Sequence, residues 1–206
     1  MLDKDNLYKV ITFIKNWKSV GDDVEYAIIT YEDFCYLVFK QTDSKRDWIN
    51  NFNFPVKPYK NQESCLLVAR GWGNAYKSCN DKIMNDFIYQ LKLNGKVPVI
   101  CGWSYGGAMS VIASEDFYYR TKIKPIVITY GAPKPLFGVR SKRYVNSCTQ
   151  YTRQYSHKSD VVTLLPPFLG YKRLCSNWIG KFNLFGLFNP EKYHCIYGTK
   201  SLYDNL

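Results

Sequence analysis

The chain has 206 residues, 46% of them hydrophobic and 17% aromatic, which is enough apolar material for one packed domain over residues 1–206 and excludes a disordered tail. No run approaches the roughly 20 apolar residues of a membrane-spanning helix, which excludes a protein built on such spans. The net charge of +11 lies mostly in residues 104–206, which carry +9. A field of this sign attracts anionic lipid surfaces or nucleic acid, or serves solubility alone. Nucleic acid is not expected as a partner and is kept as the weaker alternative, because the chain has no arginine-rich helix or zinc-finger spacing.

The chain begins with a predicted helix and a predicted strand pair. Residues 1–20 are expected to form an amphipathic helix, because apolar residues recur at helical spacing before a glycine: Leu7, Val10, Ile11, Ile14 and Trp17. Residues 26–31 and 34–39 are apolar runs separated only by Glu32-Asp33. This pattern predicts two strands joined by a tight turn.

A loop, a strand and a helix are predicted next. Residues 43–63 are polar and aromatic with two prolines, which is typical of a long loop. Residues 65–69 form an apolar strand pattern, and residues 80–93 show helical spacing that ends at Asn94-Gly95.

The most informative stretch is a strand, a glycine-rich turn and a helix in immediate succession. Residues 97–101 are a short apolar run, residues 102–107 are rich in glycine, and residues 108–119 return to helical spacing. Another buried strand follows at residues 126–130. Strands that alternate with helices predict an α/β fold with a mostly parallel central sheet flanked by helices.

The turn contains a candidate nucleophile. Ser104 lies in Gly-Trp-Ser-Tyr-Gly, and glycines two residues to either side allow the strand and the helix to approach while the serine hydroxyl is lifted clear. The motif alone occurs by chance in about 5% of chains with this composition. Its position between an apolar strand and an amphipathic helix favours a catalytic serine.

A catalytic serine requires a base, and the chain contains only His157 and His194. The order along a chain of this fold type is serine, acid, histidine. This order favours His194 as the base and leaves His157 as a structural or loop histidine near the site. Asp160 follows a strand-like stretch at residues 151–156 and is the candidate acid that orients the histidine; a turn or capping aspartate is the alternative.

Five segments in order resemble the class 3 lipase family, a branch of the α/β hydrolases, from about Tyr26 to Tyr197. They are Phe39-Lys-Gln-Thr-Asp-Ser-Lys-Arg-Asp-Trp-Ile49, Ala69-Arg-Gly-Trp-Gly-Asn-Ala-Tyr76, Gly102-Trp-Ser-Tyr-Gly-Gly-Ala108, Thr129-Tyr-Gly-Ala-Pro133 and His157-Lys-Ser-Asp-Val-Val-Thr-Leu-Leu-Pro-Pro167. The resemblance implies an α/β-hydrolase fold. It also implies that Ser104, Asp160 and His194 form a catalytic triad.

The resemblance further implies an oxyanion hole. Its donors would be the backbone N–H of Thr42, with its hydroxyl, and the backbone N–H of Tyr105. The sequence departs from the family pattern because Lys40-Gln41 replaces the usual Arg-Gly before Thr42. Trp103 and Tyr105 replace the common His and Leu on either side of the serine, which changes the shape of the pocket.

Two segments are candidates for contact with a lipid. The lid position in this family corresponds to the loop at residues 43–63, and residues 168–189 form an insertion dense in aromatic and leucine side chains. Such side chains could line an acyl pocket or touch a lipid surface, with Lys172, Arg173 and Lys181 facing anionic head groups. Ordinary core packing is the equally weighted alternative.

The predicted function is hydrolysis of the carboxylic esters of lipids by a serine hydrolase that needs no metal or cofactor. The alternative is a hydrolase scaffold that has lost turnover and binds lipids or membranes. The seven cysteines are odd in number and contain no Cys-x-x-Cys pair, and the chain starts without the charge order of a secretory signal. An intracellular location is therefore predicted, while oligomeric state and head-group preference are not.

Overall fold

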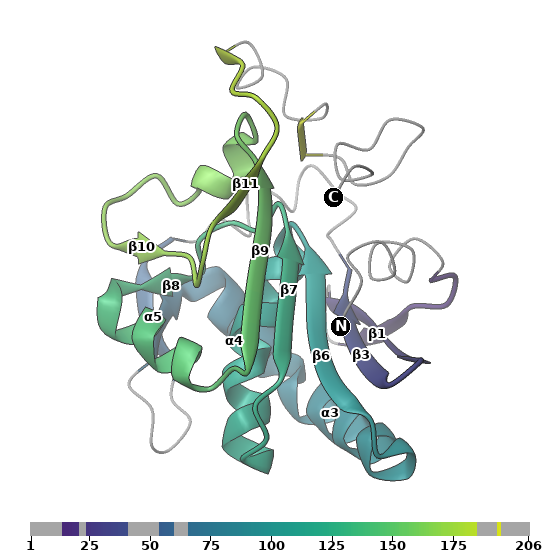
Figure 1. The fold of residues 1–206 in the computed structure, drawn as a ribbon. Helices are drawn as coiled ribbons and strands as arrows, with labels where there is room; N and C mark the ends of the chain where they lie inside the picture. The colour runs from purple at the N-terminus through teal and green to yellow at the C-terminus, as the bar shows by residue number, and fades with distance from the viewer. Residues whose placement is uncertain (1–13, 21–23, 41–53, 60–65, 185–192, 195–206) are drawn as a thin grey trace.

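The computed structural model describes residues 14–20, 24–40, 54–59, 66–184 and 193–194, which contain two sheets and the helices packed on them (Figure 1). The larger sheet has seven strands in these residues, in the order β1-β2-β3-β6-β7-β9-β11. Their bounds are β1 Lys18–Val20, β2 Val24–Tyr31, β3 Phe34–Phe39, β6 Val97–Trp103, β7 Ile126–Tyr130, β9 Tyr151–His157 and β11 Asn177–Ile179.

The larger sheet is mostly parallel, as the sequence predicts. β2 pairs antiparallel with β3 through the predicted hairpin, whose turn residue Glu32 has a φ of 48°. From β3 onward, each neighbouring pair runs parallel. The carboxyl ends of β6, β7 and β9 therefore meet at one edge of the sheet, where an α/β fold places its site.

Pro98 lies inside β6, a central strand, where proline is normally excluded. It pairs with Cys35 of β3, but the ladder to β7 begins only at Val99. Pro98 therefore lies before the first residue of β6 that pairs with β7, so the β6–β7 ladder does not need its missing N–H.

The smaller sheet is antiparallel in the order β10-β8-β5-β4. Its strands are β4 Val56–Tyr59, β5 Leu66–Ala69, β8 Leu136–Phe137 and β10 Tyr171–Lys172. The predicted loop at 43–63 is wrong over 56–59, which pair with β5; residues 43–53 and 60–63 lie outside the described residues. Of the strand predicted at 65–69, residues 66–69 form β5 of this second sheet, and residue 65 lies outside the described residues.

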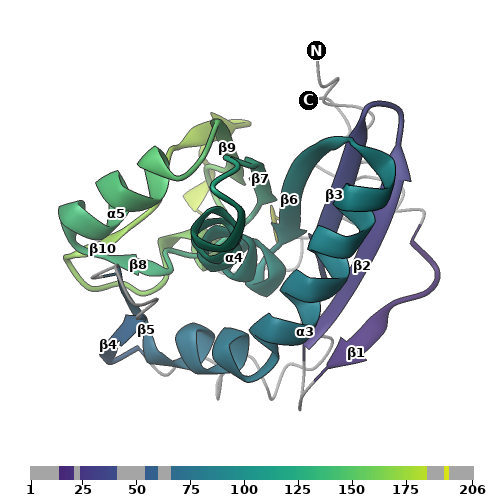
Figure 2. The same ribbon diagram turned by 90° about the horizontal axis from the view of Figure 1, so that it is seen from below.

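Three α-helices and one 3₁₀ turn complete the described elements: α3 Arg70–Asn94, α4 Tyr105–Thr121, α5 Gly138–Ser147 and η1 Val161–Leu164. Figure 2 shows α3 and α4 on the same face of the larger sheet. The main apolar core lies between this face, the helices and the smaller sheet. None of these helices is both long enough and apolar enough to traverse a bilayer.

The predicted helix at 1–20 is wrong at its end. Residues 18–20 form β1, in which Val20 lies opposite Val24 of β2, while residues 14–17 have no regular structure and residues 1–13 lie outside the described residues. Pairing with the edge of the sheet replaces helical hydrogen bonds for Lys18–Val20. Helical spacing of apolar residues does not show that strand pairing will replace the helix here, because the pairing depends on a partner strand.

α3 begins ten residues before its predicted start at Asn80. Two glycines and an asparagine lower the helix propensity of the first turns of α3. The helix forms there nevertheless, because it buries Trp72 and Tyr76 in the core. Gly73 is required there, because a Cβ would lie 2.7 Å from Cγ2 of Val68. The helix does end as predicted, with Gly95 at a φ of 63° and its N–H bonded to the Leu91 carbonyl.

A buried carboxylate joins α3 to α4. Asp116 is fully buried and accepts hydrogen bonds from the Tyr76 hydroxyl at 2.9 Å and from Arg120 Nε at 2.9 Å. Arg120 also bonds Asp81 at the surface, at 2.6 Å. Asp116 thus satisfies two donors that would otherwise face an apolar helix interface.

We expect Asp116→Ala to lower the free energy of unfolding by about 3 kcal/mol, because it strips a partner from a half-buried guanidinium and from a buried hydroxyl. The matched control is Asp81→Ala, which removes the exposed partner of the same Arg120 and should cost about 1 kcal/mol or less. Urea unfolding followed by tryptophan fluorescence measures both. Equal losses in the two variants would contradict the assigned role.

Candidate active site

Ser104 occupies a strained turn between β6 and α4. Its φ of 55° and ψ of −122° lie outside the regions that side-chain-bearing residues normally adopt. The turn closes because Gly102 and Gly106 lack side chains: a Cβ on Gly102 would collide with the Gly106 carbonyl. The backbone N–H of Ser104 bonds the Tyr130 carbonyl of β7 at 2.9 Å, so the sheet holds the serine at its carboxyl edge.

The first turn of α4 lies against the segment that leads to Thr42. A Cβ on Gly106 would collide with the carbonyl oxygens of Phe39 and Lys40. Tyr105 is the first residue of α4, and the N–H groups of a first helical turn are directed out of the positive end of the helix dipole. Thr42 itself lies outside the described residues.

Lys40, which replaces the family's arginine, is held by β2. Its Nζ lies 2.7 Å from Glu25 Oε2, and its backbone N–H bonds the Glu25 carbonyl at 2.9 Å. The side chain also lies 5.9 Å from the centre of the Trp17 ring. These contacts hold Lys40 in place directly before Gln41 and Thr42.

Asp160 follows β9 and caps η1. Its Oδ1 accepts the backbone N–H of Val162 at 3.0 Å, and Oδ2 lies 2.8 Å from His194 Nδ1. The residue is 1% exposed. Both carboxylate oxygens are therefore engaged, one by its own turn and the other by the histidine.

His194 lies between the acid and the serine. Its Nε2 is 2.7 Å from Ser104 Oγ, and all three side chains are buried, with Ser104 2% and His194 7% exposed. The structure thus brings together the three residues predicted from the sequence. This geometry allows a proton to pass from the serine hydroxyl to the imidazole while the carboxylate holds the opposite nitrogen.

The contacts that two further residues make with the triad were not predicted from the sequence. Trp103 donates from Nε1 to the carbonyl of His194 at 2.9 Å, and their ring centres are 5.5 Å apart. Gly131, with a φ of 56°, lies where a Cβ would be 3.0 Å from the His194 ring and 3.1 Å from Asp160 Oδ2. The only sign of the Gly131 contact in the sequence was that this glycine belongs to the Tyr-Gly-Ala-Pro segment.

The aromatic insertion predicted at 168–189 is not one loop in its described part. Residues 171–172 and 177–179 are strands of the two sheets, and Arg173 is buried, with its guanidinium 5.1 Å from the Trp178 ring centre and bonded to Ser156. The prediction that Arg173 faces lipid head groups is therefore wrong. Residues 185–189 lie outside the described residues.

Large apolar side chains remain exposed around the carboxyl edge of the sheet. They lie in and after η1 and in and after β11: Leu164, Phe168, Leu169, Trp178, Phe182 and Leu184. Figure 1 shows η1 and the segment after β11 at the same end of the molecule as the carboxyl ends of β7 and β9. The Phe168 ring also packs edge to face on Phe54 at 6.1 Å.

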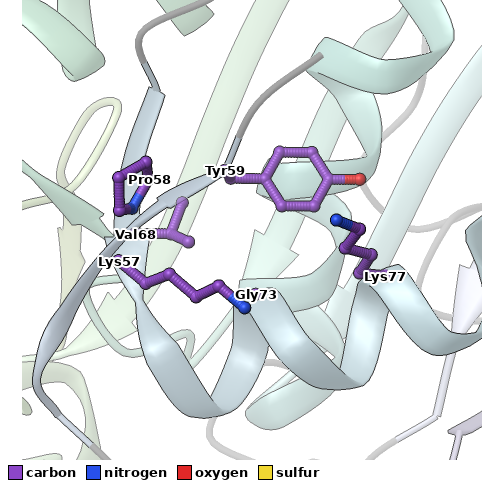
Figure 3. Close-up of a pocket in the computed structure, with 6 residues that line it drawn as sticks. All are labelled: Lys57, Pro58, Tyr59, Val68, Gly73 and Lys77. Carbon is purple, nitrogen blue, oxygen red and sulfur yellow. The ribbon is translucent and has the colours of Figure 1, made fainter.

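A separate hollow of about 130 Å³ lies between the β4–β5 strands and α3 (Figure 3). Its lining residues are Lys57, Pro58, Tyr59, Val68, Gly73 and Lys77. Lys57 Nζ donates to Asn74 Oδ1 at 2.6 Å. None of the three triad residues lines this hollow, so the candidate chemistry lies elsewhere.

Comparisons with known proteins agree with this geometry. The family model "Lipase (class 3)" matches residues 36–170. A lipase of Rhizopus niveus is 30% identical over 145 residues, which cover 64% of this chain and 34% of the relative. A lipase of Rhizomucor miehei is 26% identical over 167 residues, which cover 76% of this chain and 45% of the relative. The chain thus spans less than half the length of these curated relatives.

The fold is also that of solved lipases. A triacylglycerol lipase whose catalytic centre is described as a serine protease triad superposes with a TM-score of 0.72 at 23% identity, over 81% of this chain and 66% of that one. This similarity establishes the α/β-hydrolase architecture predicted from the sequence.

Proposed function

The chain belongs to the class 3 lipase family, and from this premise we propose that it hydrolyses the carboxylic esters of lipids. The observation that carries the proposal is the continuous chain of contacts from Ser104 Oγ to His194 Nε2 at 2.7 Å and from His194 Nδ1 to Asp160 Oδ2 at 2.8 Å. A buried imidazole between a hydroxyl and a carboxylate suits acyl transfer.

In the first half of the proposed reaction, Ser104 Oγ attacks the ester carbonyl carbon while His194 Nε2 takes the hydroxyl proton. Asp160 keeps the other imidazole proton on Nδ1 and stabilises the cation. The negative charge on the carbonyl oxygen would be met by the backbone N–H of Tyr105 and by Thr42, and each such donor is typically worth about 3 kcal/mol. The carbonyl re-forms, the bond to the alcohol breaks, and His194 delivers the proton to the leaving oxygen.

The second half releases the acid. Water attacks the acyl group on Ser104 while His194 again accepts a proton. The bond to Ser104 Oγ then breaks, the serine regains its proton, and the carboxylic acid departs. No step needs a metal or a redox cofactor.

Hydrolysis of p-nitrophenyl esters of increasing acyl length tests the proposal, with released p-nitrophenol as the readout. We expect turnover of short and medium esters by the unaltered protein. A well-folded protein that cleaves none of them would favour the alternative of a lipid-binding scaffold without turnover.

The lipid surface is the second part of this proposal. Exposed apolar side chains lie in the segments that follow the carboxyl end of β9 and in and after β11, and Leu169 is 99% exposed. Lys158 and Lys181 are exposed beside them. Apolar side chains with neighbouring cations are the combination that binds at an anionic bilayer surface.

Leu169→Asp should weaken binding to phosphatidylglycerol-containing vesicles at least about tenfold, because each methylene buried in the bilayer contributes about 0.8 kcal/mol. Leu93→Asp is the matched control: Leu93 is also exposed but lies at the end of α3, just before the start of β6 and thus at the opposite end of that strand from Ser104. Vesicle sedimentation measures both. Equal binding of the two variants would contradict the assigned surface.

The chemistry of the cysteines supports the predicted intracellular location. The five cysteines within the described residues are all free, and four of them are buried. Unpaired thiols of this kind persist most readily in a reducing compartment.

A further inference from the structure

His157, the histidine outside the triad, contacts the segments that carry Asp160 and His194. His157 ends β9 and is 5% exposed. Its backbone carbonyl accepts the N–H of Asp160 at 3.0 Å. Its Nδ1 accepts the N–H of Ser159 at 3.1 Å, so the imidazole must be neutral on this nitrogen.

The same imidazole also contacts the segment that carries the base. Its ring centre lies 4.8 Å from that of Tyr193, which directly precedes His194. Tyr193 receives a second contact, because Asn183 Nδ2 donates to its hydroxyl at 3.3 Å. The N–H of Asn183 in turn bonds Ser159 Oγ at 2.8 Å. One network therefore connects the turn before Asp160 with the residue before His194.

There is little room for His157 to move within this network. A Cβ on Gly180 would collide with Nε2 of the imidazole, and β11 pairs with β9 up to Ile179 opposite His157. The backbone thus closes one side of the ring, while Tyr193 covers another. A change at Nδ1 must therefore be absorbed by the turn at Ser159 and Asp160.

We propose that His157 is a positioning residue whose neutral imidazole holds both the turn carrying Asp160 and the segment carrying His194, and whose protonation releases the turn. Protonation places a second donor at Nδ1, directly facing the N–H of Ser159, and two donors cannot bond each other. This role rests on the proposed serine-hydrolase function. It adds a second proton-sensitive group to the site, distinct from His194.

The charges around His157 fit this role. Burial lowers the pKa of His157 below its ordinary value of 6.5, Asp160 opposes that shift and Lys158 adds to it. The unfolded chain therefore binds this proton more readily than the folded one, so the contribution to stability is present above about pH 6.5 and is lost as the pH falls toward the lowered pKa. Within the described residues, Tyr193 is a further titratable side chain that packs against the ring.

The test is the acid limb of the rate of labelling by a fluorophosphonate, which reports the activated serine without requiring a particular lipid. In the unaltered protein, the slope of log rate against pH should steepen toward 2, because protonation of His194 and of His157 each removes activity. The fluorescence of the folded protein defines the pH range that is used. A slope that stays at 1 overturns the proposal, whereas a protein that is never labelled overturns the proposed function instead.

Two variants separate positioning from simple packing. In His157→Asn, the side-chain oxygen can accept the N–H two residues on, as in an Asx turn, but it does not titrate; we expect labelling at pH 8 close to that of the unaltered protein and a slope of 1. His157→Leu cannot accept that bond, and its labelling should fall about 100-fold. Full activity of the leucine variant would overturn the proposal. Should that variant fail to fold, the slope of the asparagine variant decides, because a slope that still approaches 2 is equally contradictory.

Discussion

Replacement of Ser104 by alanine is expected to abolish fluorophosphonate labelling and to lower kcat for ester hydrolysis on the order of 10⁶-fold. The hydroxyl lies 2.7 Å from His194 Nε2, so the substitution removes the group that the base would activate. The variant should fold, since Ser104 contributes its backbone N–H rather than its side chain to the contact with β7. Single-turnover hydrolysis measures the loss of ester turnover, and mass spectrometry of the protein after exposure to the probe measures the loss of labelling.

Ser110→Ala is the control for this experiment. Ser110 is also fully buried on α4, but its hydroxyl bonds the Gly106 carbonyl within the helix. Its loss should leave labelling intact. A Ser104→Ala protein that is labelled as fast as the unaltered protein would require another nucleophile.

The parts of the fold that depend on local pattern were predictable. β6, the turn at Ser104 and α4 follow one another directly, so apolar period and glycine spacing determine them without knowledge of distant partners. β7 was predicted with its actual bounds for the same reason. The assignment of His194 depended on chain order among only two histidines, which is a constraint that few sequences offer.

The parts that depend on distant partners were not predictable. β1 is a strand because β2 offers it an edge, and β4 and β5 form a second sheet because β8, about seventy residues later, completes it. The bond from Trp103 to the carbonyl of His194 joins residues 91 positions apart. Propensity and periodicity contain no information about such pairings, which are decided by the packing of the whole chain.

Replacement of Asp160 by asparagine is expected to lower kcat about 10⁴-fold while leaving the fold intact. The N–H of Val162 lies 3.0 Å from Oδ1 and needs an acceptor there, so the amide oxygen of asparagine must occupy that position. Its NH₂ group then faces His194 Nδ1 at the place of Oδ2. A donor at this place forces the imidazole proton onto Nε2, where the proton faces Ser104 Oγ. Nε2 can then no longer accept the serine proton.

This directional argument makes the Asp160→Asn result distinct from a general loss of packing. The turn keeps its bond to Val162, so thermal unfolding should change little, while ester turnover should collapse. Asp160→Ala removes both contacts and should lower stability as well as activity, because the buried N–H of Val162 loses its partner. Nuclear magnetic resonance of the His194 ring nitrogens would report the tautomer directly. An asparagine variant that retains the proton on Nδ1 and full turnover would show that Asp160 does not orient the base.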